Sequence, residues 1–180
     1  DVSMKIIKKL THFIRLLIYS PEQYARSVGV KIGEKCWINT RHFGSEPYLI
    51  SIGDHVQITK GVEFLTHGGG WIYREEIPDM DYFGKIIIKD NVYIGTGSYI
   101  LPGVTIESNV VVAAGSVVTK SVPRGVVIGG NPARIIGNLE DYKNKILKYN
   151  LKTKQLKASQ KRAVIESANE DLFIKKPYIK

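Results

Sequence analysis

The stretch IKDNVYIGTGSYILPGVTIESNVVVAAGSVVTKSVP, residues 88 to 123, decides the fold because it repeats every six residues. The first position of each unit is aliphatic: Ile88, Ile94, Ile100, Ile106, Val112 and Val118. The fifth position is small or β-branched: Val92, Ser98, Val104, Val110, Ser116 and Val122. Strands of a β-sandwich alternate with a period of two, so a strict period of six predicts a coil of short parallel strands.

The fourth position of the same units predicts the corners of the coil. It holds residue types that tolerate turn or left-handed backbone: Asn91, Gly97, Gly103, Asn109, Gly115 and Ser121. Three units, about 18 residues, then form one turn of a triangular coil that buries an aliphatic column. The same phase occurs upstream from Ile52 and from Ile32, which places Cys36 in the inward fifth column.

Several segments of this coil resemble the hexapeptide-repeat acyltransferases, especially the galactoside and maltose O-acetyltransferases. They are GKIIIKDNVYIG, ILPGVTI, VVAAGSVVTKSVP and GGNPARII. Two more, FGSEPYLI at 43–50 and THGGG at 66–70, are similar to acetyltransferases of capsule and O-antigen biosynthesis. The resemblance covers about residues 28–137 and implies an all-β fold, a left-handed parallel β-helix. It also implies acetyl transfer from acetyl-CoA to a hydroxyl, in a groove between the subunits of a homotrimer.

The chain is predicted to contain three parts: an N-terminal helical cap at 1–27, the coil at 28–137 with a loop at 68–84, and a basic helix and tail at 138–180. Apolar residues recur at near-helical spacing in the first part: Ile6, Ile7, Leu10, Phe13, Ile14 and Leu17. They predict a helix that caps the open end of the coil or, as an alternative, a basic amphipathic helix on a membrane surface. Residues 139–149 predict a short helix, and the remainder is expected to be extended or exchanged between subunits.

Composition narrows the class of protein. A single cysteine among 180 residues excludes an internal disulfide framework, and the apolar run LLIY at 16–19 is too short to span a bilayer. We therefore expect a cytoplasmic protein, with peripheral membrane contact as an open alternative. The net charge is +9, and residues 139–180 hold 11 Lys or Arg against 5 Asp or Glu. Because no nucleic-acid motif accompanies these charges, a solvated helix face is favoured over nucleic-acid binding.

Acetyl transfer to an alcohol needs a base near neutral pKa and donors for the developing oxyanion. Histidine is the natural base, and His67 matches the catalytic histidine of the family at the point where the repeat ends, in FLTHGGGWIY. His12 and His55 are expected to be surface residues, whereas His42 faces inward or toward the site. His55 and His67 are 12 residues apart and fall on different faces, so no metal site is expected.

The loop at 68–84 is the predicted acceptor-binding element, because a loop of this length in a compact domain is usually functional. The candidates to stack on sugar faces are Trp71, Tyr73, Tyr82 and Phe83, and the candidates to bind hydroxyl groups or a charged sugar are Arg74, Asp79 and Asp81. The alternative is that the aromatic residues attach the loop to a neighbouring subunit. Asn39 matches a substrate-binding asparagine of the galactoside branch, and the competing interpretation is an asparagine that satisfies corner backbone.

The resemblance also implies the contacts with acetyl-CoA. The backbone N–H of Thr96 is the candidate oxyanion donor, whereas Ala114, Thr119 and Lys120 match contacts along the CoA molecule. Arg134 matches a phosphate contact, which suits a guanidinium group. Tyr93 stands where the family usually has tryptophan, and Gly137 stands where a second basic residue often follows NPAR.

The sequence therefore predicts an acetyl-CoA-dependent O-acetyltransferase that acts on a sugar hydroxyl in surface polysaccharide biosynthesis. The nearest alternative is N-acetylation of an amino-sugar nucleotide, which uses the same fold and donor. A noncatalytic trimeric scaffold with a basic tail is the third hypothesis. The identity of the acceptor does not follow from the sequence.

Overall fold

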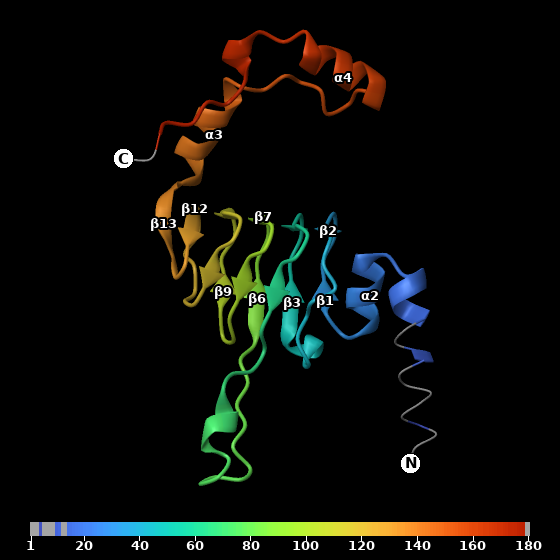
Figure 1. Ribbon diagram of the computed structural model, residues 1–180, viewed down its shortest axis with the longest axis vertical. Helices are drawn as coiled ribbons and strands as arrows, with labels where there is room; N and C mark the ends of the chain where they lie inside the picture. The colour runs from blue at the N-terminus through green and yellow to red at the C-terminus, as the bar shows by residue number, and fades with distance from the viewer. Residues whose placement is uncertain (1–3, 5–9, 12–13, 179–180) are drawn as a thin grey trace. The chain divides into compact units, whose positions relative to one another are not determined.

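The structure is a computed structural model that describes residue 4, residues 10 and 11 and residues 14–178 of the chain. The chain divides into two compact units, Asp1–Leu139 and Glu140–Lys180. The first unit is a coil of short strands, from which one long loop projects (Figure 1). Unlike the strands of a sandwich, these strands pair in parallel with the corresponding strand of the next coil.

Three sheets form the sides of the coil, and in its middle turns successive strands belong to each sheet in turn. The first sheet contains β1(Lys31–Ile32), β3(Ile50–Ile52), β6(Ile86–Ile88) and β9(Thr105–Ile106). The second contains β2(Trp37–Ile38), β4(Gln57–Ile58), β7(Val92–Ile94), β10(Val110–Val112), β12(Val126–Gly130) and β13(Ala133–Asn138). The third contains β5(Glu63–Phe64), β8(Tyr99–Ile100) and β11(Val117–Val118).

The register confirms the predicted length of one coil. Ile88 pairs with Ile106, Ile94 with Val112 and Ile100 with Val118, and the members of each pair are 18 residues apart. Because every pair is parallel and in register, aliphatic side chains stack directly above one another and backbone groups bond from coil to coil. Only β12 and β13 pair in an antiparallel way among the described strands, and they end the coil.

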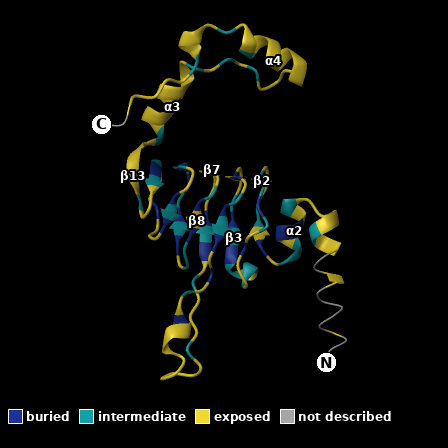
Figure 2. Cartoon of the chain, in the orientation of Figure 1, coloured by how far each residue is buried: buried dark blue, intermediate teal, exposed yellow. Residues whose placement is uncertain are grey.

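The predicted inward columns form the core (Figure 2). All six first-position residues from Ile88 to Val118 are at most 1% exposed, and the fifth-position residues are buried as well. Polar members of the column are satisfied internally, since Ser98 Oγ donates to the carbonyl of Gly95 at 2.7 Å. Cys36 is only half-buried, and its Sγ donates to the carbonyl of Gly53 at 3.1 Å.

The fourth-position residues form the corners, as predicted. A positive φ occurs at Asn91, Gly97, Gly103, Asn109 and Gly115, and Ser121 is the exception. Lys35 and His55 have the same geometry in earlier coils, with φ of 56° and 54°. The corner position of His55 in the sequence repeat is therefore confirmed.

The start of the coil is covered by helix α2(Pro21–Ser27). Ser20 and Gln23 form a capping box at the start of this helix. Pro21 follows Ser20 directly, and proline suits the first turn of a helix. Tyr24 and Ala25 are the buried residues of α2. By contrast, Leu10, Ile14 and Leu17, predicted to cap the coil, are 43% to 70% exposed. Ile6, Ile7, His12 and Phe13 lie outside the described residues.

The second unit contains α3(Leu139–Leu147), which begins at the last residue of the first unit, then α4(Ala158–Glu166) and the short 3-10 helix η3(Glu170–Leu172). The predicted helix at 139–149 is thus confirmed. The absence of regular structure expected beyond it is wrong, because α4 forms a helix without burying any residue. The apolar residues Ala163, Val164 and Ile165 of α4 are consecutive in the sequence, so they do not mark one face of a helix. Among the described helices, none is long and apolar enough to cross a membrane.

Candidate active site

The chain leaves the coil at the corner that follows the third sheet, and His67 stands at this exit. Phe64 and Thr66 before it are fully buried. The loop returns at Gly84, whose N–H donates to the Thr66 carbonyl at 2.8 Å, while His67 forms a bridge with Phe83. Both ends of the loop are therefore held together, and His67 occupies the neck of the loop.

Gly84 shows how tightly the neck is packed. A Cβ at this position would lie 2.2 Å from the backbone nitrogen of Gly103, in the corresponding corner of the next coil. Backbone atoms of a regular coil cannot move aside as a flexible side chain can, so only glycine fits. The coil therefore fixes the neck, and with it the backbone of His67.

Glu46 is the direct partner of the His67 ring. Its Oε2 atom lies 3.0 Å from His67 Nδ1 and accepts a hydrogen bond from Thr66 Oγ1 at 2.6 Å. The side chain of Glu46 is 15% exposed, whereas that of His67 is 44% exposed. The Thr66 hydroxyl, followed by His67, lowers the pKa of Glu46, so this carboxyl is ionised at neutral pH.

An ionised carboxylate can only accept hydrogen bonds, and this decides the tautomer of His67. Nδ1 carries the proton that faces Glu46, and Nε2 of the neutral ring keeps its lone pair. The exposed ring is therefore oriented with a free nitrogen, as a general base requires. This arrangement suits removal of a proton from a hydroxyl group.

Glu46 was not among the site residues predicted from the sequence. It belongs to FGSEPYLI, which served only as a family segment, although a carboxylate 21 residues before the candidate base was a usable signal. The coil brings the two together because Phe43 stacks on Phe64 at 5.5 Å, with His42 bridged to Glu63 beside them. Glu46 and His67, each three positions after one of these phenylalanines, therefore lie at the same corner.

The predicted acceptor residues fall into two groups. Tyr82 lies against the neck, since a Cβ on Gly68 would meet its ring, and Phe83 is edge-on to His67 at 6.4 Å between ring centroids. Trp71, Tyr73 and Arg74 belong to the 3-10 helix η2(Gly70–Tyr73) and its C-cap, in the part of the loop that projects away from the coil (Figure 1). Trp71 is 79% exposed. Of the predicted acceptor contacts in the loop, Tyr82 is thus the one placed beside His67.

Three of the predicted CoA contacts line one depression of about 410 Å³ at the end of the coil. Thr119 and Lys120 come from the corner after β11, and Arg134 comes from β13. Among the described residues that line this depression, none is Asp or Glu. Two cations without a competing carboxylate fit the phosphate groups of CoA.

Asn39, Thr96 and Ala114 lie at a different corner, the one between the second and third sheets. Asn39 directly follows β2, and its N–H donates to the carbonyl of Ile58 at 2.8 Å. The carbonyl of Thr96 accepts a hydrogen bond from Gly115, next to Ala114, at 2.8 Å. Tyr93 points outward from the second sheet and is 39% exposed. Within one chain, the structure does not bring these residues to His67.

Of the other described histidines, His42 and His55, neither has a carboxylate within hydrogen-bond distance. His42 Nδ1 is 3.7 Å from Glu63 Oε1, and the His42 side chain is 60% exposed. His55 lies at the corner between the first and second sheets. Within the described chain, no group of three or more His, Cys, Asp or Glu side chains could hold a metal ion.

Comparison with known proteins gives the family. A model described as bacterial transferase hexapeptide (six repeats) matches residues 85–120. Protein CapG of Staphylococcus aureus is 51% identical over 161 residues, which are 87% of this chain and 92% of that protein. A galactoside O-acetyltransferase of Lactococcus lactis is 30% identical over 158 residues, covering 73% of this chain and 75% of that one.

A solved structure agrees with these relatives. A galactoside acetyltransferase in complex with coenzyme A has a TM-score of 0.53 and 27% identity, covering 77% of this chain and 82% of that one. The chain therefore belongs to the bacterial hexapeptide-repeat transferases, and within this family it is an acetyltransferase.

Proposed function

We propose that the protein transfers an acetyl group from acetyl-CoA to a saccharide hydroxyl in surface polysaccharide biosynthesis. The observation that carries this proposal is the Glu46–His67 pair, which leaves Nε2 of an exposed imidazole free to accept a proton. The galactoside O-acetyltransferase among the relatives supports a sugar acceptor. The segments FGSEPYLI and THGGG, similar to acetyltransferases of capsule and O-antigen biosynthesis, favour a polysaccharide precursor.

The residues perform the reaction as follows. His67 Nε2 takes the proton of the acceptor hydroxyl as its oxygen bonds to the acetyl carbonyl carbon. Glu46 stays ionised and stabilises the protonated ring. When the carbon–sulfur bond breaks, His67 returns the proton to the departing thiolate. The products are an acetyl ester and the free thiol of CoA.

The proposed donor site combines the depression at the end of the coil with the region around the corner between the second and third sheets. Acetyl-CoA supplies the activated thioester. Thr119, Lys120 and Arg134 bind its phosphate end, because their depression combines two cations with apolar walls. The Thr96 N–H stabilises the developing oxyanion, and Ala114 and Tyr93 contact the pantetheine arm.

These parts lie at different corners of one coil, so we propose that two copies of the chain complete each site. His67 of one subunit then faces the corner of Thr96 and Asn39 on its neighbour, in a homotrimer of left-handed coils formed by residues 28–137. Asn39 orients the acceptor hydroxyl, and Trp71, Tyr73, Arg74 and Tyr82 contact the rest of the acceptor. The enzyme works in the cytoplasm, where surface precursors are assembled at the inner face of the membrane.

The test is acetyl-CoA consumption with a panel of sugars and amino sugars. We expect turnover with hydroxyl acceptors and a fall in kcat of about 10²- to 10⁴-fold in His67→Ala, the usual contribution of a general base. His42→Ala is the matched control, since His42 also lies near a glutamate but at 3.7 Å. Full activity of His67→Ala would disprove the mechanism.

The same panel separates the alternatives. Acetylation of amino sugars alone would establish N-acetylation, and failure to bind acetyl-CoA would favour a scaffold. Sedimentation at the mass of a monomer, with activity retained, would contradict the shared site.

A further inference from the structure

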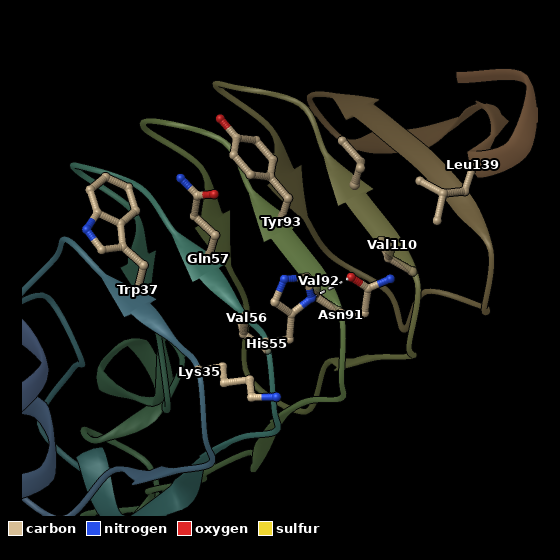
Figure 3. Close-up of a pocket in the computed structure, with 11 residues that line it drawn as sticks. Lys35, Trp37, His55, Val56, Gln57, Asn91, Val92, Tyr93, Val110 and Leu139 are labelled. Atoms are coloured by element: carbon tan, nitrogen blue, oxygen red, sulfur yellow. Dashed lines mark hydrogen bonds between the residues drawn. The ribbon is translucent and has the colours of Figure 1, made fainter. Parts of the chain in front are cut away.

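A second depression, of about 290 Å³, lies on the outer face of the second sheet, away from the corner of His67. Two parallel rows of side chains build it. The first row is Trp37, Gln57, Tyr93 and Val111, which pair directly across β2, β4, β7 and β10. Figure 3 shows Trp37, Gln57 and Tyr93 projecting side by side from neighbouring strands. A floor of buried valines, Val56, Val92 and Val110, lies beneath.

The second row stands two residues earlier in each coil, at the corner between the first and second sheets. It consists of Lys35, His55, Asn91 and Asn109, all with φ between 54° and 62°, and the first three line the depression. Because all four share this left-handed geometry, their side chains leave the corner in the same direction. This polar row therefore runs alongside the first row over the same four coils. The first row is called the aromatic row below, after Trp37 and Tyr93.

Hydrogen bonds within the polar row orient His55. Asn91 Nδ2 donates to Asn109 Oδ1 at 2.7 Å, so the Asn91 carbonyl oxygen faces His55 Nδ1 at 2.9 Å. Nδ1 must then carry the proton, and Nε2 is left for another partner. Figure 3 shows this pair at the edge of the depression, with Lys35 nearby. The free Nε2 and the Lys35 ammonium are polar groups available to a ligand.

The aromatic row offers flat surfaces to a ligand. Trp37 is 52% exposed and Tyr93 is 39% exposed. They are two strands apart, about 10 Å between backbones, with the Gln57 amide between them. Apolar ring faces alternating with hydrogen-bonding groups match a sugar chain, in which C–H faces alternate with hydroxyl groups.

The charge of the depression favours an acidic ligand. Lys35 lines it, and among the described residues of the lining none is Asp or Glu. Two of the carboxylates that precede the polar row bond to the backbone of the corner: Asp54 Oδ1 accepts from the Glu34 N–H at 2.7 Å, and Asp90 Oδ1 accepts from the Asp54 N–H at 2.8 Å. Glu34, next to Lys35, is exposed outside the lining.

We propose that this depression binds an acidic saccharide chain. Trp37 and Tyr93 stack on its rings, Gln57 and His55 Nε2 bond to hydroxyl groups, and Lys35 pairs with a carboxylate. The proposal goes beyond acetyl transfer, since His67 takes no part in this binding. Tyr93 also belongs to the proposed donor site, so the test varies other residues and includes acetyl-CoA as a competitor.

The chain contains two tryptophans, Trp37 and Trp71, so Trp71→Phe leaves Trp37 as a specific fluorescent reporter. This full-length variant is titrated with a trimer of galacturonic acid and with neutral maltotriose. We expect a saturable change in Trp37 emission with the acidic trimer, at an affinity at least about 10-fold higher than for maltotriose, the worth of one charge-assisted bond. Adding Lys35→Ala should abolish this preference, whereas adding His67→Ala should preserve it.

Calorimetry on the wild-type protein and on Gln57→Ala provides a measurement without fluorescence, and weaker binding by Gln57→Ala is expected. No saturable binding, or equal binding of both trimers, would overturn the proposal. It would also be overturned if acetyl-CoA alone changed the Trp37 emission and displaced the saccharide. A fall in sedimentation mass on Trp37→Ala would identify the face as a subunit interface instead.

Discussion

Glu46 and His67 come from consecutive coils, and their side chains meet at 3.0 Å in the corner where the loop leaves. The same Glu46 oxygen accepts a hydrogen bond from Thr66 Oγ1 at 2.6 Å, so one carboxylate oxygen contacts both a hydroxyl of a buried residue and the exposed ring. The proposed base, His67, is thereby oriented by the coil, although it stands at the neck of an exposed loop.

Replacement of this carboxylate should slow the reaction without changing donor affinity. In Glu46→Gln the charge that stabilises the protonated His67 is lost, and we expect kcat to fall about 10- to 100-fold, the worth of a charge-assisted hydrogen bond. The KM for acetyl-CoA should stay unchanged. Steady-state kinetics check both values. Glu63→Gln, beside His42, is the matched control and should leave kcat intact; wild-type kcat in Glu46→Gln would contradict a positioning role.

The stability of the protein should depend on the charge of Glu46. Its pKa is lowered, mainly by the Thr66 hydroxyl. A group with a lowered pKa stabilises the folded state above its unfolded pKa, and this contribution is lost as the pH falls through the folded pKa. Wild type should therefore exceed Glu46→Gln in free energy of unfolding near about pH 7, and the difference should shrink as the pH falls through the lowered pKa of Glu46. Urea denaturation over a series of pH values measures this, and a constant difference would refute it.

The neck of the loop should not tolerate a side chain at Gly84. In Gly84→Ala the new Cβ would meet the backbone of Gly103 and Pro102, so we expect a loss of about 1–3 kcal/mol, the usual cost of overpacking. Activity should fall as well, because His67 shares the neck. Thermal denaturation and kinetics measure the two effects. Gly69→Ala is the control: no atom lies within 4 Å of its Cβ position and its φ is −80°.

The basic depression at the end of the coil should govern donor affinity. Arg134→Ala removes one of its two cations, and we expect the KM for acetyl-CoA to rise about 10-fold or more while the KM for the acceptor stays constant. Lys89→Ala, an exposed lysine that follows β6 on the first sheet, should change neither. An unchanged KM for acetyl-CoA in Arg134→Ala would place the phosphates elsewhere.

Much of the fold could be predicted because the repeat is local. The aliphatic first position and the turn-forming fourth position occur in every unit, and the structure buries the former and gives most of the latter a positive φ. Helix α4 could not be predicted, since its apolar residues Ala163, Val164 and Ile165 are consecutive and do not recur at helical spacing. The exposure of Leu10, Ile14 and Leu17 was likewise missed, because spacing predicts a face but not its partner.

The candidate site was also predicted only in part. His67 was predicted as the base because it matches the catalytic histidine of the family where the repeat ends, and one depression is lined by Lys120 and Arg134, the residues expected to bind phosphate. Glu46 was missed because its meeting with His67 depends on how two coils stack, at the stacked rings of Phe43 and Phe64.

The sequence by itself determined the coil, its 18-residue turn and the residue that ends it, because stacked parallel strands require the same residue types at the same positions of every unit. Only the tertiary structure decided which side chains from different coils share a corner or a face. Glu46 contacts His67, Asn39 and Thr96 lie at another corner, and Trp37 lies in the same row as Tyr93. The physical reason is that backbone hydrogen bonds between coils set which residues of neighbouring coils lie side by side. An inserted loop changes this alignment without changing the six-residue repeat.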